Sequence, residues 1–288
     1  MKSLLEYLKD AEEKKIAVGH FNISDSATLK AIFESAQKLN FPVIIGVSEG
    51  EREFLGVSQA AALVSSLRHE YNFPIFLNAD HTHSIEKVKE AAIAGYDEII
   101  FDGSSLSLDE NIKQTKEAIR VAKSISPNVL IEGEIGFIGL SSEVVDKVPD
   151  NLELSTPSDA KRFVTETGVD ILAPAVGNMH GLLKTMLSGE VKKRLNIPLI
   201  KEIKEATEIL MTLHGGSGTN DNDFSEAINA GMSIVHVNTE LRVAWRKGVE
   251  EGLKEKPEEV APYKILPTAV SNIETVVEQR LKLFNSSS

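Results

Sequence analysis

Short apolar runs alternate with amphipathic stretches along nearly the whole of this chain. Eight of the runs are candidate strands, at 16–21, 43–47, 75–78, 98–101, 129–132, 171–173, 209–213 and 234–237. Near-continuous apolar runs are typical of parallel strands that are buried on both faces. Eight strand–helix units in order predict an α/β fold, the closed (β/α)8 TIM barrel. An open, doubly wound sheet can also hold eight strands and is the alternative.

The segments between the runs carry apolar residues at helical spacing, as in 27–39, 86–94 and 111–124. An extra C-terminal helix is expected beyond the last strand, at 268–284. Two longer stretches, 136–157 and 181–204, break the regular spacing; we expect the first to be a mobile active-site loop and the second to contain another helix. No linker divides the chain, so residues 1–288 are expected to form one domain.

Charge and composition exclude several classes of function. The net charge of −12 disfavours binding to nucleic acid or to anionic membranes. The absence of cysteine rules out disulfides and thiolate metal ligands, so any zinc site must use His, Asp or Glu. The first residues lack the apolar core of a signal peptide, and no apolar run approaches the ~18 residues of a membrane span. We therefore expect a cytoplasmic protein.

Three histidines each follow one of the apolar runs: His81 in FPIFLNADH, His180 in DILAPAVGNMH and His214 in ILMTLH. In a barrel, the residues just beyond the strands gather on one face, where such barrels carry out their chemistry. A single histidine is more often structural than a ligand. Three at equivalent strand ends favour an open metal site with a free position for substrate.

Acidic residues occur at the same strand ends. Asp80 precedes His81, and its carboxyl could either move a proton or orient a histidine. Asp102 follows the fourth run, while Glu132 and Glu134 alternate on the fifth, which places both on one side of a strand. These carboxylates could hold a second cation, pair with a lysine, or fill the barrel rim.

A glycine-rich turn, HGGSG at 214–218, follows the seventh run, and Asn238 and Thr239 open a helix after the eighth. These are the barrel loops that commonly bind phosphate, helped by a helix N-terminus. Lys184, close to His180, could add a positive charge. A metal, a proton-carrying carboxyl and a phosphate site together suit the making or breaking of a carbon–carbon bond beside a ketone, or an isomerisation.

From about residue 4 to residue 283, the chain resembles the class II (metal-dependent) fructose-bisphosphate and tagatose-bisphosphate aldolase family. The matching segments are GHFN (19–22), VSEG (47–50), NADH (78–81), IIFDGS (99–104), EGEIG (132–136), GNMHGLLK (177–184), LHGGSG (213–218) and VNTEL (237–241). The resemblance implies reversible cleavage of a ketose bisphosphate to dihydroxyacetone phosphate and an aldehyde. It also implies a homodimer or homotetramer.

The resemblance further implies roles for individual residues. His81, His180 and His214 would bind a catalytic Zn²⁺, and Asp80 would donate a proton to the aldehyde oxygen. Asp102 and Glu134 match positions that hold a second divalent or monovalent cation in some members. The residues expected to line the pocket or bind phosphate are Asn22, Ser48, Gly181, Lys184, Gly215, Ser217, Asn238 and Thr239.

The chain departs from the family pattern at two positions. The family carries an acid–base glutamate eight residues beyond the position of Glu134, where this chain has Ser142 followed by Glu143. A shift of one residue would let Glu143 serve as the catalytic acid–base; otherwise that role is impaired. His236 stands where the family has an asparagine that contacts the enediolate, which could change the choice of substrate or the binding of metal.

Two other functions remain open. The glycine-rich site accounts for one phosphate and no cationic residue is evident for a second, which leaves room for an aldolase acting on a ketose 1-phosphate. The displaced glutamate and His236 leave room for a non-catalytic family member that acts as a partner subunit, although Asp80 and the three histidines argue against it.

Overall fold

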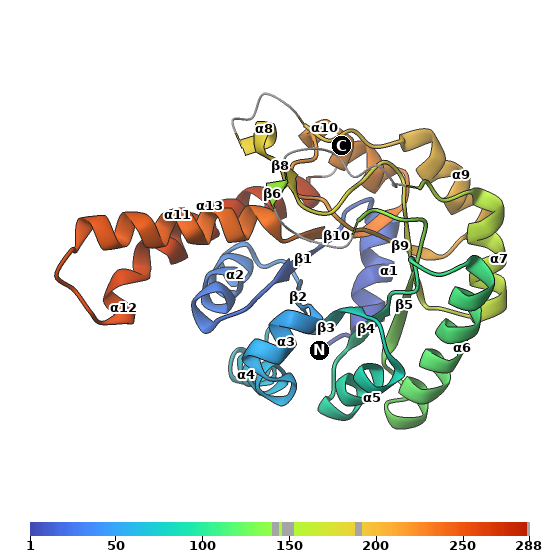
Figure 1. The fold of residues 1–288 in the computed structure, drawn as a ribbon, viewed down its shortest axis with the longest axis horizontal. Helices are drawn as coiled ribbons and strands as arrows, with labels where there is room; N and C mark the ends of the chain where they lie inside the picture. Colours follow the sequence, from blue (N-terminus) through green and yellow to red (C-terminus); the bar gives the residue numbers. More distant parts are fainter. Residues whose placement is uncertain (140–143, 146–152, 188–191, 287–288) are drawn as a thin grey trace.

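Eight parallel strands close into a barrel in the computed structural model, which describes residues 1–139, 144–145, 153–187 and 192–286 (Figure 1). Their order around the barrel is β1-β10-β9-β7-β5-β4-β3-β2. This closed order confirms the TIM barrel and excludes the open sheet. The strands are β1 (Val18–Asn22), β2 (Val43–Val47), β3 (Ile75–Thr82), β4 (Glu98–Phe101), β5 (Leu130–Ile135), β7 (Ile171–Pro174), β9 (Leu210–Leu213) and β10 (Met232–Val237).

Helices surround the barrel, as the spacing of apolar residues predicts. Several begin at a side-chain cap: Asp25, Ser84, Ser107 and Thr156 each accept a hydrogen bond from a backbone N–H of the first turn. Those that follow the strands up to β10 are α2 (Ser26–Leu39), α3 (Glu49–Leu55), α4 (Val57–Tyr71), α5 (Ile85–Ala94), α6 (Leu108–Ile125), α7 (Pro157–Thr167), α9 (Ile197–Thr207) and α10 (Asp221–Asn229).

The N-terminal mouth of the barrel is closed by a helix that the sequence analysis did not identify, α1 (Leu4–Lys14). A capping box between Ser3 and Glu6 begins it. Its buried residues Leu4, Leu8 and Ala11 share one apolar cluster with the first residues of the strands. That cluster comprises, besides these three, Val18, Ile44, Phe76, Leu130, Ile171, Leu210 and Ile234. One end of the cylinder is therefore sealed by packed apolar side chains.

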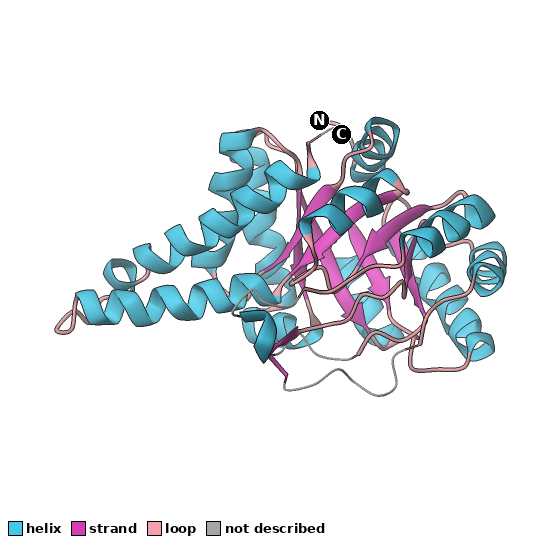
Figure 2. Cartoon of the chain, turned by 90° about the horizontal axis from the view of Figure 1, so that it is seen from above, coloured by secondary structure: helices cyan, strands magenta, loops and turns pink. Residues whose placement is uncertain are grey.

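The last strand leads into a helical hairpin that projects from the barrel (Figures 1 and 2). It consists of α11 (Thr239–Glu255), the short α12 (Pro262–Ile265) and α13 (Pro267–Phe284), the expected C-terminal helix. A Cβ atom at Gly248 would lie 2.3 Å from the Cα atom of Ala269, so the two long helices can approach this closely only with glycine there. The inner part of α13 also packs against α2 and β1.

Two short strands, β6 (Val144–Val145) and β8 (Leu182–Leu183), pair in parallel outside the barrel, and α8 (Lys184–Leu187) follows. Glu143 and much of the 136–157 loop lie outside the described residues. The single domain and the mobility of that loop therefore remain predictions. Among the helices that the structure describes, none combines the length and apolar character needed to cross a membrane.

Candidate active site

The carboxyl end of β3 is distorted in a way that turns two consecutive side chains toward the same cavity. The strand continues to Thr82, beyond its expected end, and its register with β4 shifts between Ala79 and Thr82. His81 has a φ of 41°, in the left-handed region that residues with a Cβ rarely adopt. Such irregularities redirect side chains. Asp80 and His81 both line the cavity at the carboxyl end of the barrel.

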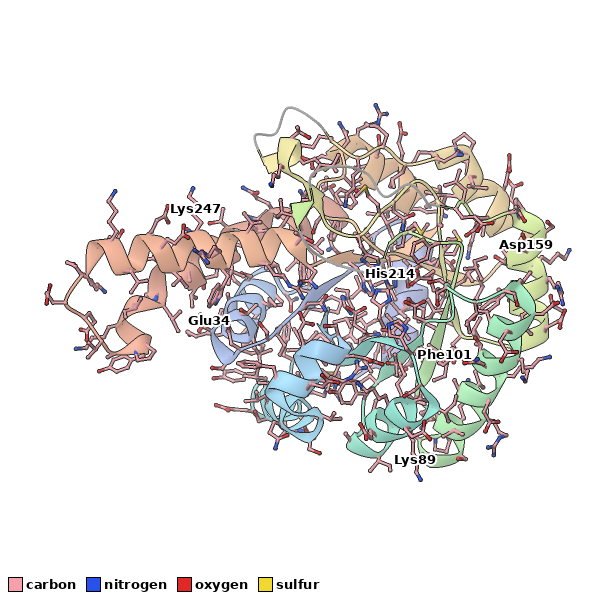
Figure 3. The ribbon with its side chains drawn as sticks, viewed as in Figure 1. Glu34, Lys89, Phe101, Asp159, His214 and Lys247 are labelled. Carbon is pink, nitrogen blue, oxygen red and sulfur yellow. The ribbon has the colours of Figure 1, made fainter. Side chains whose placement is uncertain are left out.

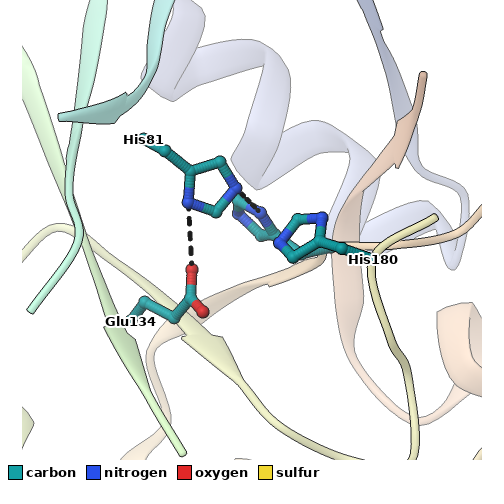
Figure 4. Close-up of side chains that lie close together, drawn as sticks. His81, Glu134 and His180 are labelled. Atoms are coloured by element: carbon teal, nitrogen blue, oxygen red, sulfur yellow. Dashed lines mark hydrogen bonds and ion pairs between the residues drawn. The ribbon is translucent and has the colours of Figure 1, made fainter. Parts of the chain in front are cut away.

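The structure brings His81, His180 and His214 together at this end. The ring centroid of His81 lies 4.7 Å from that of His180 and 4.8 Å from that of His214. Figure 3 places His214 near the middle of the barrel, and Figure 4 shows the Glu134 carboxylate below the His81 ring and the His180 ring to the right of it. One potential ligand atom from each of these four side chains lies within 4.8 Å of the others.

Carboxylates hold the outer nitrogens of two of these rings. His81 Nδ1 lies 2.8 Å from Asp102 Oδ2, and His214 Nε2 lies 2.6 Å from Glu132 Oε1. When the outer nitrogens donate to the carboxylates, the inner nitrogens, His81 Nε2 and His214 Nδ1, are the ones left to bind a metal, and they lie 3.2 Å apart. That is close to the separation of about 3.3 Å between two nitrogen ligands of tetrahedral zinc. The donor set therefore fits a metal ion.

The electrostatics of the site also favour a cation beside His81. Burial opposes charge on this ring, but Asp80, Asp102 and Glu134 raise the pKa of His81 well above its usual value. Burial, together with the neighbouring His81, lowers the pKa of His214 to about 3. The same causes lower the pKa of His180 well below its usual value. Two of the three imidazoles are thus neutral, the form that binds metal, and a metal ion would replace the proton of the third.

Asp102 and Glu134, the pair expected at a second cation, have different surroundings. Asp102 Oδ1 accepts hydrogen bonds from the backbone N–H and hydroxyl of Ser104, while its Oδ2 lies against His81. Glu134 Oε2 lies 3.5 Å from His81 Nδ1 and makes no hydrogen bond within the described part of the chain. Burial and the nearby Asp102 raise the pKa of Glu134 well above its usual value. Asp102 thus supports a histidine, and a second cation remains a prediction.

The two carboxylate oxygens of Asp80 differ in their hydrogen bonds to the described residues. Asn22 Nδ2 donates to Asp80 Oδ2 at 2.8 Å and to Glu51 Oε2 at 2.9 Å. Asp80 Oδ1 is buried, makes no hydrogen bond within the described residues, and lies 3.7 Å from both His81 Nε2 and His236 Nδ1. Burial opposes ionisation, but His81 and other nearby histidines lower the pKa of Asp80. An ionised carboxylate with a free oxygen is suited to accept a proton from a substrate hydroxyl.

His236 belongs to a stack of imidazoles. Its ring centroid lies 3.4 Å from that of His20, with the planes 5° apart, and 4.0 Å from that of His214. His20 Nε2 lies 3.1 Å from Asn78 Oδ1. A Cβ atom at Gly46 would lie 2.1 Å from His20, so the neighbouring strand can accommodate this ring only with glycine there. Burial lowers the pKa of His236 well below its usual value, which keeps the stacked ring neutral.

Most of the residues expected to bind phosphate also line the cavity. Gly215 has a φ of 60°, and a Cβ atom there would lie 2.3 Å from the carbonyl oxygen of Met179, so this turn requires glycine. Ser217 Oγ accepts from the backbone N–H groups of Asn238 and Glu240, which joins the turn to the N-terminus of α11. The residues that line the cavity are Asn22, Asp80, His81, His180, Gly181, Gly215, Ser217, His236, Asn238 and Thr239.

Two residues expected in this pocket are not among those that line the described cavity. Ser48 begins α3, and its backbone N–H donates to Glu51 Oε2. Lys184 is exposed at the start of α8. Neither the pairing of Glu132 with His214 nor the stacking of His20 on His236 was expected from the sequence. The alternation of Glu132 with Glu134 predicts that both lie on one side of the strand, but it does not indicate which histidine each would face.

Comparisons with known proteins agree with the barrel fold and show the family. The family model described as fructose-bisphosphate aldolase class-II matches residues 2–288. A fructose-bisphosphate aldolase of Staphylococcus aureus (strain Mu50) is 35% identical over 288 residues, covering 99% of this chain and 97% of its own. The crystal structure of the YdjI aldolase from Escherichia coli K12 has the same fold, with a TM-score of 0.81 at 24% identity, covering 100% of this chain and 98% of its own.

Fructose-bisphosphate aldolase of Campylobacter jejuni also shares this fold, with a TM-score of 0.79 at 22% identity; the match covers 98% of this chain and 94% of that one. The barrel, the cluster of histidines and carboxylates, and the full-length match to the family model all point to one assignment. The chain belongs to the class II fructose-bisphosphate aldolase family, whose members are metal-dependent lyases.

Proposed function

We propose that this chain catalyses the reversible cleavage of a ketose bisphosphate, fructose 1,6-bisphosphate or tagatose 1,6-bisphosphate, to dihydroxyacetone phosphate and an aldehyde. His81, His180 and His214 are proposed to bind the catalytic zinc. The observation that carries the proposal is the convergence of ring nitrogens close to Asp80 Oδ1, which makes no hydrogen bond within the described part of the chain. A cytoplasmic location and assembly as a homodimer or homotetramer remain predictions.

Each residue of the site has a part in this reaction. Zinc, when bound, would polarise the ketose carbonyl and stabilise the negative charge left by cleavage. Asp80 Oδ1 accepts the proton of the substrate hydroxyl as the carbon–carbon bond breaks and that hydroxyl becomes the aldehyde carbonyl. Asn22 fixes the carboxylate by its hydrogen bond to Oδ2. Glu143, which lies outside the described residues, is proposed to return a proton to the carbanionic carbon of the dihydroxyacetone phosphate half.

A neighbouring cavity favours a substrate with two phosphates. It shares Asn22 and Asn238 with the cavity described above and is also lined by Arg242. Arg242 Nη2 lies 2.7 Å from Glu51 Oε1, while the guanidinium remains partly exposed at this cavity. A guanidinium is well suited to bind a phosphate. Arg242 thus offers the second positive charge that the sequence analysis did not find, which favours a bisphosphate over a ketose 1-phosphate.

The proposal is tested by a coupled cleavage assay on four preparations: native protein, chelator-treated protein, zinc-restored protein and a zinc-restored Arg242→Gln variant. We expect cleavage to disappear with the metal and return with zinc. The Arg242→Gln variant should lose kcat/KM for both bisphosphates but not for a ketose 1-phosphate. Full activity after complete removal of zinc would contradict the proposal. Zinc binding without turnover of any ketose phosphate would support the non-catalytic alternative.

A further inference from the structure

Lys193 is a buried lysine whose ammonium group faces three backbone carbonyl oxygens. Its Nζ atom lies 2.6 Å from the carbonyl oxygen of Met179, 2.6 Å from that of Gly181 and 3.0 Å from that of Gly215. Only 4% of the residue is exposed. Lysine is almost never fully buried without such partners. This side chain is not among the residues that line the cavity of the candidate site.

The three acceptors indicate which form of the lysine is present. A neutral amine has two N–H groups, whereas an ammonium has three and can satisfy all three carbonyls. Burial lowers the pKa of Lys193 to about 7, and the nearby Glu240 opposes this change. Converging carbonyl oxygens are also the ligands that proteins use for potassium ions. The ammonium therefore occupies a place that has the chemistry of a monovalent cation site.

The three carbonyls belong to the loops that build the candidate site. Met179 and Gly181 flank His180, and Gly215 directly follows His214. Gly181 and Gly215 also line the cavity on its proposed phosphate side. The backbone N–H of Lys193 donates to Gly218 O at 2.9 Å, so the lysine is itself tied to the glycine-rich turn. One positive charge thus links two loops that each carry a candidate metal ligand.

We infer that Lys193 is a positioning residue that acts as a built-in monovalent cation. Its ammonium draws the Met179, Gly181 and Gly215 carbonyls together and places a positive charge behind the phosphate-binding glycines. The effect of the ammonium on phosphate binding rests on the proposed function, whereas its binding of the three carbonyls does not. Without the ammonium, three buried carbonyls would face one another with no donor, which is unfavourable unless another cation enters.

The inference predicts that shortening this side chain creates a site for a small cation. Lys193→Ala removes the charge and leaves space, whereas Lys193→Met removes the charge but fills the space with an apolar chain. Lys193→Gln keeps two N–H donors without a charge, and is the variant to use if Lys193→Ala does not fold. Lys192→Ala, at the exposed neighbouring lysine, is the matched control.

The experiment compares zinc-loaded proteins at constant ionic strength in potassium, ammonium or tetramethylammonium chloride, since the last cation is too large for the cage. Thermal midpoint and KM for fructose 1,6-bisphosphate are measured in each salt. We expect Lys193→Ala in tetramethylammonium to show a lower midpoint and a KM raised about tenfold or more, both largely restored by potassium or ammonium. Lys193→Met should not be restored, and native protein and Lys192→Ala should not respond.

Two results would overturn the inference. One is a Lys193→Ala variant with native midpoint and KM in tetramethylammonium; the other is a loss that no small cation reverses. If Lys193→Ala does not fold, Lys193→Gln takes its place. A native KM in that variant would show that the positive charge is not required and would overturn the inference, whereas a raised KM would support the inference. The thermal midpoint requires no turnover, so a cation-dependent midpoint would support the inference even if native protein failed to cleave any ketose phosphate.

Discussion

The two mouths of the barrel are built from the same strands but differ in almost every physical property. At the N-terminal mouth, Leu8 of α1 packs among apolar strand residues such as Phe76 and Ile234. At the carboxyl mouth, the last residues of β3 include the left-handed His81, and Asp80 Oδ1 lies buried without a hydrogen bond within the described residues. A left-handed backbone at a residue with a Cβ and a buried carboxylate oxygen without a hydrogen bond both reduce stability, so their occurrence side by side at this mouth marks it as the end suited to chemistry.

The contrast arises within single strands. β3 contributes Phe76 to the apolar cluster and, a few residues later, Asp80 and His81 to the cavity. β10 does the same with Ile234 and His236. Because a barrel strand spans the cylinder from mouth to mouth, its first residues can be selected for packing and its last for function. Substitutions at the two ends should therefore separate stability from activity.

The largest expected effect at the carboxyl mouth is that of Asp80→Asn. Loss of a group that moves a proton in the transition state should lower kcat by about 10²–10⁴-fold. Because the variant keeps all three histidines, the amount of bound zinc should stay the same. Steady-state kinetics together with elemental analysis check this. A kcat within a few-fold of the native value would show that Asp80 has no such role.

At the opposite mouth, Leu8→Ala should change stability and leave catalysis intact. Removing a fully buried leucine side chain should lower the free energy of unfolding by about 2–5 kcal/mol, because a cavity remains where α1 meets the strands. Denaturant unfolding measures the loss, with Glu13→Ala on the exposed face of α1 as the control. A large fall in kcat/KM for Leu8→Ala under native conditions would break the separation between the two mouths.

A smaller effect is expected at a residue that supports the metal ligands. Asp102→Asn removes the charge that holds His81 Nδ1, so zinc affinity should fall by about 10–100-fold. Competition with a chelator of known affinity measures this change. Asp109→Asn, an exposed side chain on α6, should have no effect. An unchanged zinc affinity in Asp102→Asn would mean that His81 does not bind the metal in this orientation.

The smallest effect concerns the stacked rings. His236→Asn should change the ratio of kcat/KM between fructose and tagatose bisphosphates by about 2–10-fold, the size expected for one altered hydrogen bond. His20→Ala removes the ring that supports His236 and should shift the ratio in the same direction. Side-by-side kinetics on both sugars check both variants. A shifted ratio in His236→Asn with an unshifted ratio in His20→Ala would show that the stack does not position His236.

Sequence patterns predicted those parts of the molecule that depend on local periodicity. The barrel strands are buried on both faces, so each appears as an apolar run, and their ends bring His81, His180 and His214 to one mouth. Helix α13 was also expected, as an extra helix beyond the last strand. The cavity also contains Asn238 and Thr239, which were expected from their place after the last strand.

Features that depend on contacts between distant segments could not be predicted in the same way. The register shift near the end of β3 depends on its pairing with β4, and the stacking of His20 on His236 depends on the closure of β1 against β10. Lys193 lies in a segment with no clear periodicity, and its three carbonyl partners come from two loops of the folded chain. Local sequence contains no signal for such pairings.

The proposed metal site is tested most directly by locating the metal through anomalous X-ray scattering at the zinc absorption edge in crystals of the zinc-loaded protein. We expect a peak at the carboxyl mouth, about 2.0–2.1 Å from His81 Nε2, His214 Nδ1 and a ring nitrogen of His180. A zinc ion bound elsewhere, with these three imidazoles uncoordinated, would contradict the proposed metal site and the aldol cleavage that depends on it.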